Sequence, residues 1–265
     1  MQEYIESAIL GLIQGLTEFL PVSSSGHLEI AKYIFGENSI GEESLLMTVV
    51  LHFATALSTI VVFRKDVVFL IQGLFKRSGS EQRTFVGWII ISMIPAAIIG
   101  VFFDEWVESM FSNNLLLVGS MLIVTAVLLY FADVFNARKD GNNYFKSFII
   151  GVSQAVAIIP GISRSGATIS TALLLGLDRL QAARLSFLMV VPLIFGKMAK
   201  DIMSGELMES NIDKGELVIG FLVAFITGYL ACTWMIAIVK NSQLRYFSIY
   251  CLLVGLIAIG YVYFT

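Results

Sequence analysis

The sequence predicts an all-α protein that crosses a membrane several times, with six transmembrane helices and two re-entrant helical hairpins in an inverted-topology repeat. Three observations predict this class: the composition, the lengths of the apolar runs, and a motif that occurs twice. Hydrophobic residues fill 57% of the 265 positions and charged residues only 14%, whereas a soluble domain carries about 25% charged residues. The mean hydropathy is +0.84. We therefore expect one membrane domain, residues 1–265.

The apolar runs give the expected spans. A helix needs about 20 apolar residues to cross a bilayer. Five runs free of Asp, Glu, Lys and Arg reach or approach that length. A sixth is shorter, but Lys197 and Lys200 follow it, and their long side chains can reach the membrane surface. The predicted spans are 45–63, 84–103, 112–132, 185–196, 217–239 and 246–265.

Two further apolar regions are interrupted and predict re-entrant hairpins. Residues 7–17 form a short charge-free helix that ends shortly before Pro21. Residues 147–163 and 165–177 are separated by Arg164. Irregular backbone at membrane depth is tolerated only where protein or a water-filled cavity surrounds it. Each break is therefore either a loop in water or a site within the protein.

The basic residues orient the chain, because cytoplasmic loops are rich in Lys and Arg. The loop 104–111 and the segment 36–43 are acidic and are expected outside. Basic residues flank the second hairpin, so it enters from the cytoplasm, whereas the first enters from outside. Both chain ends are then outside. The basic residues expected in the cytoplasm are Arg64, Lys65, Lys76, Arg77, Arg83, Arg138, Lys139, Lys146, Arg179, Arg184, Lys240 and Arg245.

The two hairpins share a motif. GLIQGLTEFLPVSSSG (11–26) aligns with GVSQAVAIIPGISRSG (151–166), and the identical pairs are Gly11/Gly151, Gln14/Gln154, Ser23/Ser163, Ser25/Ser165 and Gly26/Gly166. Together with the opposite orientations, this predicts an inverted repeat, with repeat 1 at about 1–134 and repeat 2 at about 141–265. Such repeats bring discontinuous helices together near the membrane midplane, with helix N-termini facing an anionic group.

Each hairpin tip predicts an anion site. A Pro/Gly turn leads into Ser-x-Ser-Gly at the start of a new helix, where serine caps and free N–H groups favour phosphate. Arg164 adds a guanidinium that suits phosphate oxygens. The serines fit the capping of a broken backbone equally well. The expected phosphate-binding residues are Ser23, Ser25, Gly26, Ser163, Ser165, Gly166 and Thr168.

The first tip also holds candidate reactive groups. Ser24 would attack phosphorus after activation by Glu18 or His27, and the other of these two would protonate the leaving phosphate or hold the geometry. Direct attack by water, with Glu18 as base, fits the same residues. A purely structural ion pair between Glu18 and Arg164 is the alternative without chemistry. His52 lies mid-span without a motif and is interpreted as a packing residue.

QGLTEFLPVSSSGH and PGISRSGAT resemble the two signature motifs of bacterial undecaprenyl pyrophosphate phosphatases, which are also known for bacitracin resistance. The resemblance extends to length and span order. It implies hydrolysis of undecaprenyl diphosphate to undecaprenyl phosphate, which recycles the lipid carrier for peptidoglycan synthesis, at the outer face of the plasma membrane. By motif position, the catalytic residues of the family fall on Glu18, Ser24, His27 and Arg164. Bacitracin is expected to compete for the substrate.

The resemblance also implies a divalent cation, magnesium or calcium. Glu18 with Gln14 is the candidate ligand pair. Some family members carry a second glutamate where this chain has Gln14, so one ligand charge is missing here. We therefore expect the ion to act chiefly on the diphosphate.

A transporter or flippase of an anionic polyprenyl lipid is the main alternative, because inverted repeats with broken helices are a transporter architecture. No basic run suggests nucleic acid as a partner. A type-2 phosphatidic acid phosphatase would need a histidine where this chain has Ser170, and a P-loop would need a GK[ST] ending. A homodimer stays open, because Gly220 and Gly228 suit an interface or internal packing equally.

Overall fold

A computed structural model describes residues 2–35, 44–76, 79–103, 106, 109–110, 114–135, 140–204, 213–240 and 243–264. Several positions used to orient the chain lie outside the described residues, so their expected sides of the membrane stay predictions. These positions are the acidic segment 36–43, most of the loop 104–111, and Arg77, Arg138 and Lys139.

The regular elements among the described residues are all helices. They are α1 (Gln2–Phe19), α2 (Ser24–Phe35), α3 (Ser44–Val62), α4 (Arg64–Phe75), α5 (Ser80–Phe102), α7 (Leu115–Val134), α8 (Tyr144–Val156), α9 (Arg164–Leu174), α10 (Arg179–Ser204), α11 (Lys214–Lys240) and α12 (Leu244–Phe264). The predicted all-α class is confirmed.

Five of the described helices are long and apolar enough to cross a membrane: α5, α7, α10, α11 and α12. The bent pair α3–α4 would make a sixth span, with an angle of 77° at the break. The segment expected as the first cytoplasmic loop therefore begins with a helix, α4. An apolar run follows its charged start, and Leu70 and Gly73 are buried. The chain is a multi-pass membrane protein, and the count of six spans plus two hairpins stays a prediction.

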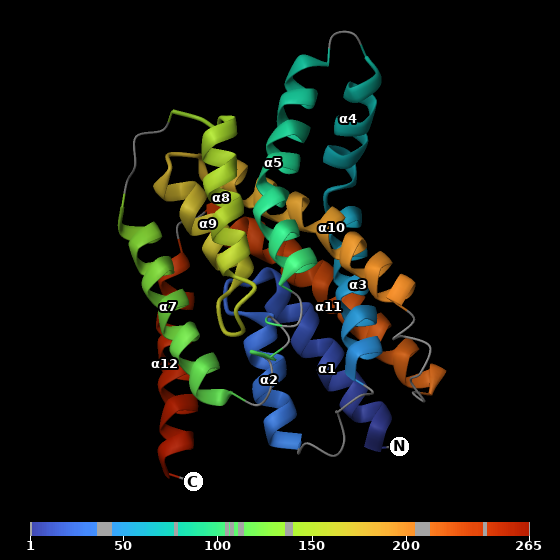
Figure 1. Ribbon diagram of the computed structural model, residues 1–265, viewed down its shortest axis with the longest axis vertical. Coiled ribbons are helices and arrows are strands. Elements are labelled where there is room, and N and C mark those ends of the chain that lie inside the picture. Colours follow the sequence, from blue (N-terminus) through green and yellow to red (C-terminus); the bar gives the residue numbers. More distant parts are fainter. Residues whose placement is uncertain are drawn as a thin grey trace.

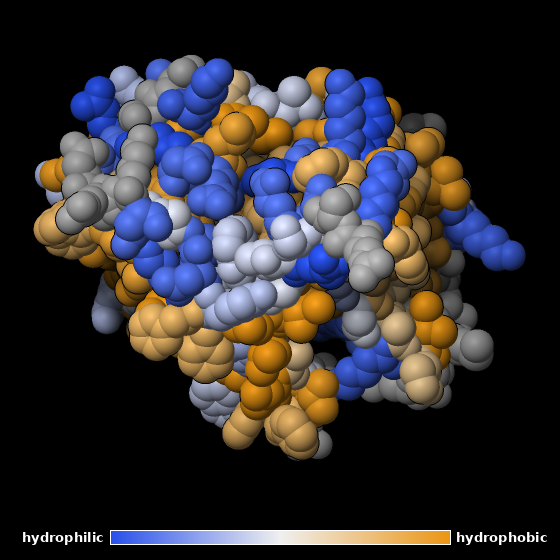
Figure 2. All heavy atoms as spheres, turned by 90° about the horizontal axis from the view of Figure 1, so that it is seen from above, coloured by the Kyte–Doolittle hydropathy of each residue, from blue (hydrophilic) through white to orange (hydrophobic). Residues whose placement is uncertain are grey.

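The outer surfaces of the long helices are apolar, as lipid contact requires. In α5, Ile90, Ile94 and Ile98 are 56%, 43% and 48% exposed. Their spacing of four residues places them on one face of the helix. Figure 2 looks onto the end of the molecule at which α4 meets α5, where hydrophilic side chains gather and hydrophobic ones lie along much of the rim. This distribution fits a polar surface at the edge of a bilayer.

The two hairpins enter the molecule from opposite ends, and their tips meet near its centre (Figure 1). The first is α1–α2 and the second is α8–α9. Helix α1 packs along α11, whereas α8 packs along α5, and α7 pairs with α12. Each hairpin thus lies against a long helix from the other half of the chain, as an inverted repeat would require.

Glycines allow these helix pairs to approach closely. A Cβ atom at Gly11 would lie 2.6 Å from the Gly220 carbonyl oxygen, and one at Gly151 would lie 2.5 Å from the Ser92 carbonyl oxygen. A Cβ atom at Gly228 would lie 3.1 Å from the Phe19 ring. Gly220 and Gly228 therefore serve packing inside the chain.

We expect Gly15→Val to destabilise the protein by about 1–3 kcal/mol through overpacking. A Cβ atom at Gly15 would collide with the Thr227 hydroxyl and with the backbone of α11. Gly260→Val is the matched control, since a Cβ atom at this helical glycine meets no described atom within 4 Å. Thermal unfolding in detergent should show a loss of several degrees for the first variant only. Equal melting temperatures would contradict the close α1–α11 packing.

Candidate active site

A strained turn forms the tip of the first hairpin. Ser23 has φ +72°, a left-handed conformation that residues other than glycine rarely adopt. Its hydroxyl oxygen accepts a hydrogen bond from the Gly26 N–H at 3.2 Å, so it caps α2. The cap places Ser24 at the first position of α2, directly after the strained residue.

The second tip repeats this arrangement. The Ser163 hydroxyl oxygen accepts from the Gly166 N–H at 3.1 Å and caps α9. In both tips the hydroxyls of the Ser-x-Ser pair lie 3.3 Å apart. Ser163 itself has φ −71°, and the left-handed residue of this tip is Gly161, two residues earlier, with φ +95°. Both hairpins thus present a serine-capped helix N-terminus, as the shared motif predicts.

The two tips touch directly. The Ser165 hydroxyl donates to the Leu20 carbonyl oxygen at 3.2 Å, and a Cβ atom at Gly26 would lie 3.1 Å from the Gly161 Cα. Thr125 on α7 supports the second tip, because its hydroxyl donates to the Gly161 carbonyl at 3.2 Å and accepts from the Ser163 N–H at 3.0 Å. Residues about 140 positions apart in the sequence therefore share one small volume.

Glu18 is the centre of this volume. Its side chain is 5% exposed and forms an ion pair with Arg164 through Oε1. The other oxygen, Oε2, accepts hydrogen bonds from the Ser24 hydroxyl at 2.7 Å and from the Gln14 amide at 3.1 Å. A buried carboxylate needs such partners to stay charged. The structure thus brings together three of the four predicted reactive residues.

Arg164 keeps one donor free. Its Nη2 contacts Glu18, whereas Nη1 is buried and has no hydrogen-bond partner among the described residues. A buried N–H without a partner costs free energy. An anion between the tips would satisfy this donor, which favours the predicted phosphate contact.

His27 is not bonded to Ser24. Its Nδ1 lies 2.8 Å from the Ser23 carbonyl oxygen and its Nε2 lies 2.8 Å from the Tyr250 hydroxyl. Of the two candidate bases, only Glu18 therefore contacts the Ser24 hydroxyl. Tyr250, on α12, was not predicted, because a single tyrosine in an apolar span carries no motif.

His52, the second histidine of the chain, makes a hydrogen bond within its own helix. It is half-buried on α3, and its Nδ1 bonds the Thr48 carbonyl oxygen at 2.8 Å. The interpretation of His52 as a packing residue stays a prediction.

The other predicted phosphate-binding residues differ in accessibility. Ser163, Ser165 and Thr168 are at most 2% exposed. The Thr168 hydroxyl already donates to the Arg164 carbonyl at 2.8 Å and lies 2.7 Å from the Ser186 hydroxyl. All three hydroxyls already have partners within the protein, so phosphate binding by them stays a prediction. Ser24 and Ser25 are half-buried.

The candidate metal ligands make an incomplete set. Both Glu18 oxygens have partners, whereas Gln14 Oε1 is buried without one. The described residues include no group of three His, Cys, Asp or Glu side chains that could hold an ion. Magnesium, however, commonly binds through one or two protein oxygens together with substrate phosphates and water. Gln14 and Glu18 fit that mode better than a closed protein site.

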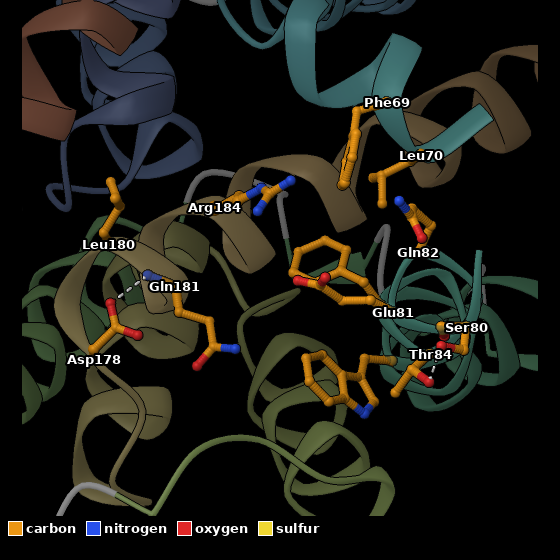
Figure 3. A pocket seen from close by; sticks show the side chains of 12 residues that line it. Phe69, Leu70, Ser80, Glu81, Gln82, Thr84, Asp178, Leu180, Gln181 and Arg184 are labelled. Atoms are coloured by element: carbon orange, nitrogen blue, oxygen red, sulfur yellow. Dashed lines mark hydrogen bonds between the residues drawn. The ribbon is translucent and has the colours of Figure 1, made fainter. Parts of the chain in front are cut away.

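A cavity of about 450 Å³ lies elsewhere, between α4, α5 and the start of α10 (Figure 3). Arg184 lines it, pairs with Asp66 at 2.6 Å and stacks over the Phe85 ring at 4.8 Å. None of the predicted site residues is among its lining residues. The hairpin tips therefore remain the candidate site.

Comparisons with known proteins agree with the motifs. The family model described as "Bacitracin resistance protein BacA" matches residues 7–257. The chain is 60% identical over 263 residues to the undecaprenyl-diphosphatase of Christiangramia forsetii, covering 98% of this chain and 99% of that protein. It is 49% identical over 260 residues to the protein of that name from Bacteroides thetaiotaomicron, covering 97% and 98%.

The similarity extends to archaea. The undecaprenyl-diphosphatase of Methanococcus vannielii is 38% identical over 266 residues, covering 97% of this chain and all (100%) of that protein. Because the family model spans nearly the whole sequence and such relatives align end to end, this chain belongs to the BacA family of bacitracin resistance proteins.

Proposed function

We propose that this protein is an undecaprenyl-diphosphatase, a membrane hydrolase that converts undecaprenyl diphosphate to undecaprenyl phosphate and inorganic phosphate. The observation that carries the proposal is the contact of Ser24, Glu18 and Arg164 across the two hairpin tips. A nucleophile, a base and a phosphate-binding cation then occupy one site. The relatives at up to 60% identity carry the name of this activity.

The geometry favours Glu18 as the base. The Ser24 hydroxyl proton points at Glu18 Oε2 over 2.7 Å. As Ser24 Oγ attacks the terminal phosphorus, the proton passes to Glu18, and the P–O bond to undecaprenyl phosphate breaks. Water then attacks the phosphorus of the phosphoserine, and the bond between Ser24 Oγ and phosphorus breaks. Ser24 Oγ takes its proton back from Glu18, which returns to its charged form, and the protons of the water stay with the released inorganic phosphate. The free Nη1 of Arg164 and the α9 N-terminus stabilise charge on the phosphoryl oxygens.

The same architecture indicates how the site would be oriented in the membrane. The first hairpin begins at the end of the molecule where α1 starts and α12 finishes (Figure 1). An outward orientation of that end would open the site to the outer face of a bacterial plasma membrane, where the lipid carrier would be recycled for peptidoglycan synthesis. Bacitracin would compete for the same diphosphate, and the exposed apolar helix faces would border the polyprenyl chain.

Ser24→Ala should lower phosphate release by on the order of 10³-fold or more, because it removes the nucleophile. The measurement is phosphate release from a long-chain polyprenyl diphosphate by detergent-purified protein. Ser153→Ala, on α8, is the control, since that hydroxyl donates to the Ile150 carbonyl of its own helix. Full activity of Ser24→Ala would show that water, and not Ser24, attacks the phosphorus. A folded wild type without turnover would contradict the hydrolase and favour a lipid transporter.

Arg164→Lys should lower kcat by about 10²-fold, the usual cost of losing one donor to a developing oxyanion. Lysine keeps the positive charge but cannot offer one nitrogen to Glu18 and a second to phosphate. Arg64→Lys is the control, because Arg64 lies at the exposed start of α4. If Arg164 served only as the structural partner of Glu18, Arg164→Lys would lower the thermal stability and leave kcat unchanged. That result would exclude the phosphate contact.

A divalent cation would enter this site with the diphosphate, whose charge it neutralises. Gln14 Oε1 is the buried oxygen without a partner beside Glu18. Gln14→Glu adds a ligand charge, so the magnesium or calcium concentration for half-maximal activity should fall by roughly tenfold. Gln72→Glu on α4 is the control of equal charge, because Gln72 is exposed and remote from the tips. An unchanged metal requirement in Gln14→Glu would remove Gln14 from the ligand set.

A further inference from the structure

The contact between His27 and Tyr250 has no part in the reaction described above. We propose that Tyr250 is a positioning residue of the active site, which holds the His27 ring in one orientation and so fixes the turn that carries Ser24. This inference rests on the proposed function, since positioning is read out through phosphate release.

The hydrogen-bond partners define the tautomer. A carbonyl oxygen can only accept, so the 2.8 Å contact between His27 Nδ1 and the Ser23 carbonyl places a proton on Nδ1. In the neutral ring, Nε2 then carries the lone pair. The Tyr250 hydroxyl, 2.8 Å away, must donate to it. The two ring planes differ by only 8°, with centroids 5.7 Å apart, so the two rings lie nearly parallel.

The histidine transmits this restraint to the turn. The Ser23 carbonyl oxygen accepts from the His27 side chain and also from the His27 backbone N–H at 3.1 Å. Ser23 is the residue with φ +72°, and its carbonyl belongs to the peptide bond that continues into Ser24. A strained conformation persists only where its surroundings hold it. The ring of His27 therefore fixes the peptide that aims the Ser24 hydroxyl at Glu18.

Helix α12 holds the same tip at two consecutive residues. Beside Tyr250, the Cys251 thiol donates to the Pro21 carbonyl oxygen at 3.5 Å. Pro21 precedes the strained turn and Ser23 forms it, so both contacts restrain the few residues before Ser24. A displacement of a reacting group by about 1 Å can cost 10²-fold in rate. Loss of the Tyr250 hydroxyl is therefore expected to act on kcat.

The test is Tyr250→Phe, which keeps the ring and removes only the hydroxyl. We expect a kcat about 10-fold to 100-fold lower, as for other residues that orient a functional histidine, with KM and melting temperature unchanged. Tyr246→Phe is the matched control, one helical turn earlier on α12, with a ring that is 58% exposed and stacked on Arg245. It should retain the activity of the wild type.

A double-mutant cycle separates positioning through His27 from a general structural effect. In a His27→Gln background, Tyr250→Phe should cause no further loss of kcat. Additive losses in the double variant, or equal activities of Tyr250→Phe and Tyr246→Phe, would overturn the proposal while leaving the hydrolase intact.

A spectroscopic measurement keeps the test independent of turnover. The chain has two histidines, so ¹⁵N-histidine NMR spectra of the wild type and His27→Gln identify the signals of His27. The Nε2 signal should have the chemical shift of a nitrogen that accepts a hydrogen bond in the wild type, and it should move toward that of a nitrogen without a donor in Tyr250→Phe. Identical His27 signals in both proteins would contradict the restraint. Absence of phosphate release in the wild type would instead contradict the proposed function.

Discussion

The contact between the Glu18 carboxylate and the Arg164 guanidinium joins two hairpins that enter the protein from opposite ends. Both groups are largely withdrawn from solvent within an apolar chain. Removing one partner of such a pair leaves an uncompensated buried charge and costs about 3–5 kcal/mol. The position of each tip therefore depends on the other, and so does the geometry of Ser24, whose hydroxyl shares the same carboxylate.

Close helix packing makes this contact reachable. The hairpin helices α1 and α8 each lie against a long helix of the other half, α11 or α5. Glycines at positions 11, 15 and 151 bring the backbones together where any side chain would separate them. Polar tips in an apolar chain are tolerable because protein surrounds them. The helix packing and the contact between Glu18 and Arg164 thus both require the two hairpin tips to lie close together.

An arrangement of this kind suits an anionic headgroup attached to a long apolar chain. The headgroup can bind between two helix N-termini while the chain stays beside lipid-facing helices. Transporters use such architecture to bind anions, but the Ser24 hydroxyl bonded to a buried carboxylate adds the elements of nucleophilic catalysis. The site is defined less by its fold than by these few side chains.

The sequence by itself determined the membrane class and the all-α fold, because hydrophobic length is a local signal. It also predicted two broken hairpins from the repeated Ser-x-Ser-Gly motif, and the structure brings Glu18, Ser24 and Arg164 together at their tips. The sequence could not show that a helix, α4, begins the first loop, or that Ser24 forms its hydrogen bond with Glu18 rather than with His27. It also could not show that His27 forms a hydrogen bond with Tyr250. Only the tertiary structure decided these points. Hydrogen-bond partners from α12 and α2 are set by how the helices pack, and Tyr250 and His27 are separated by more than 200 residues of chain.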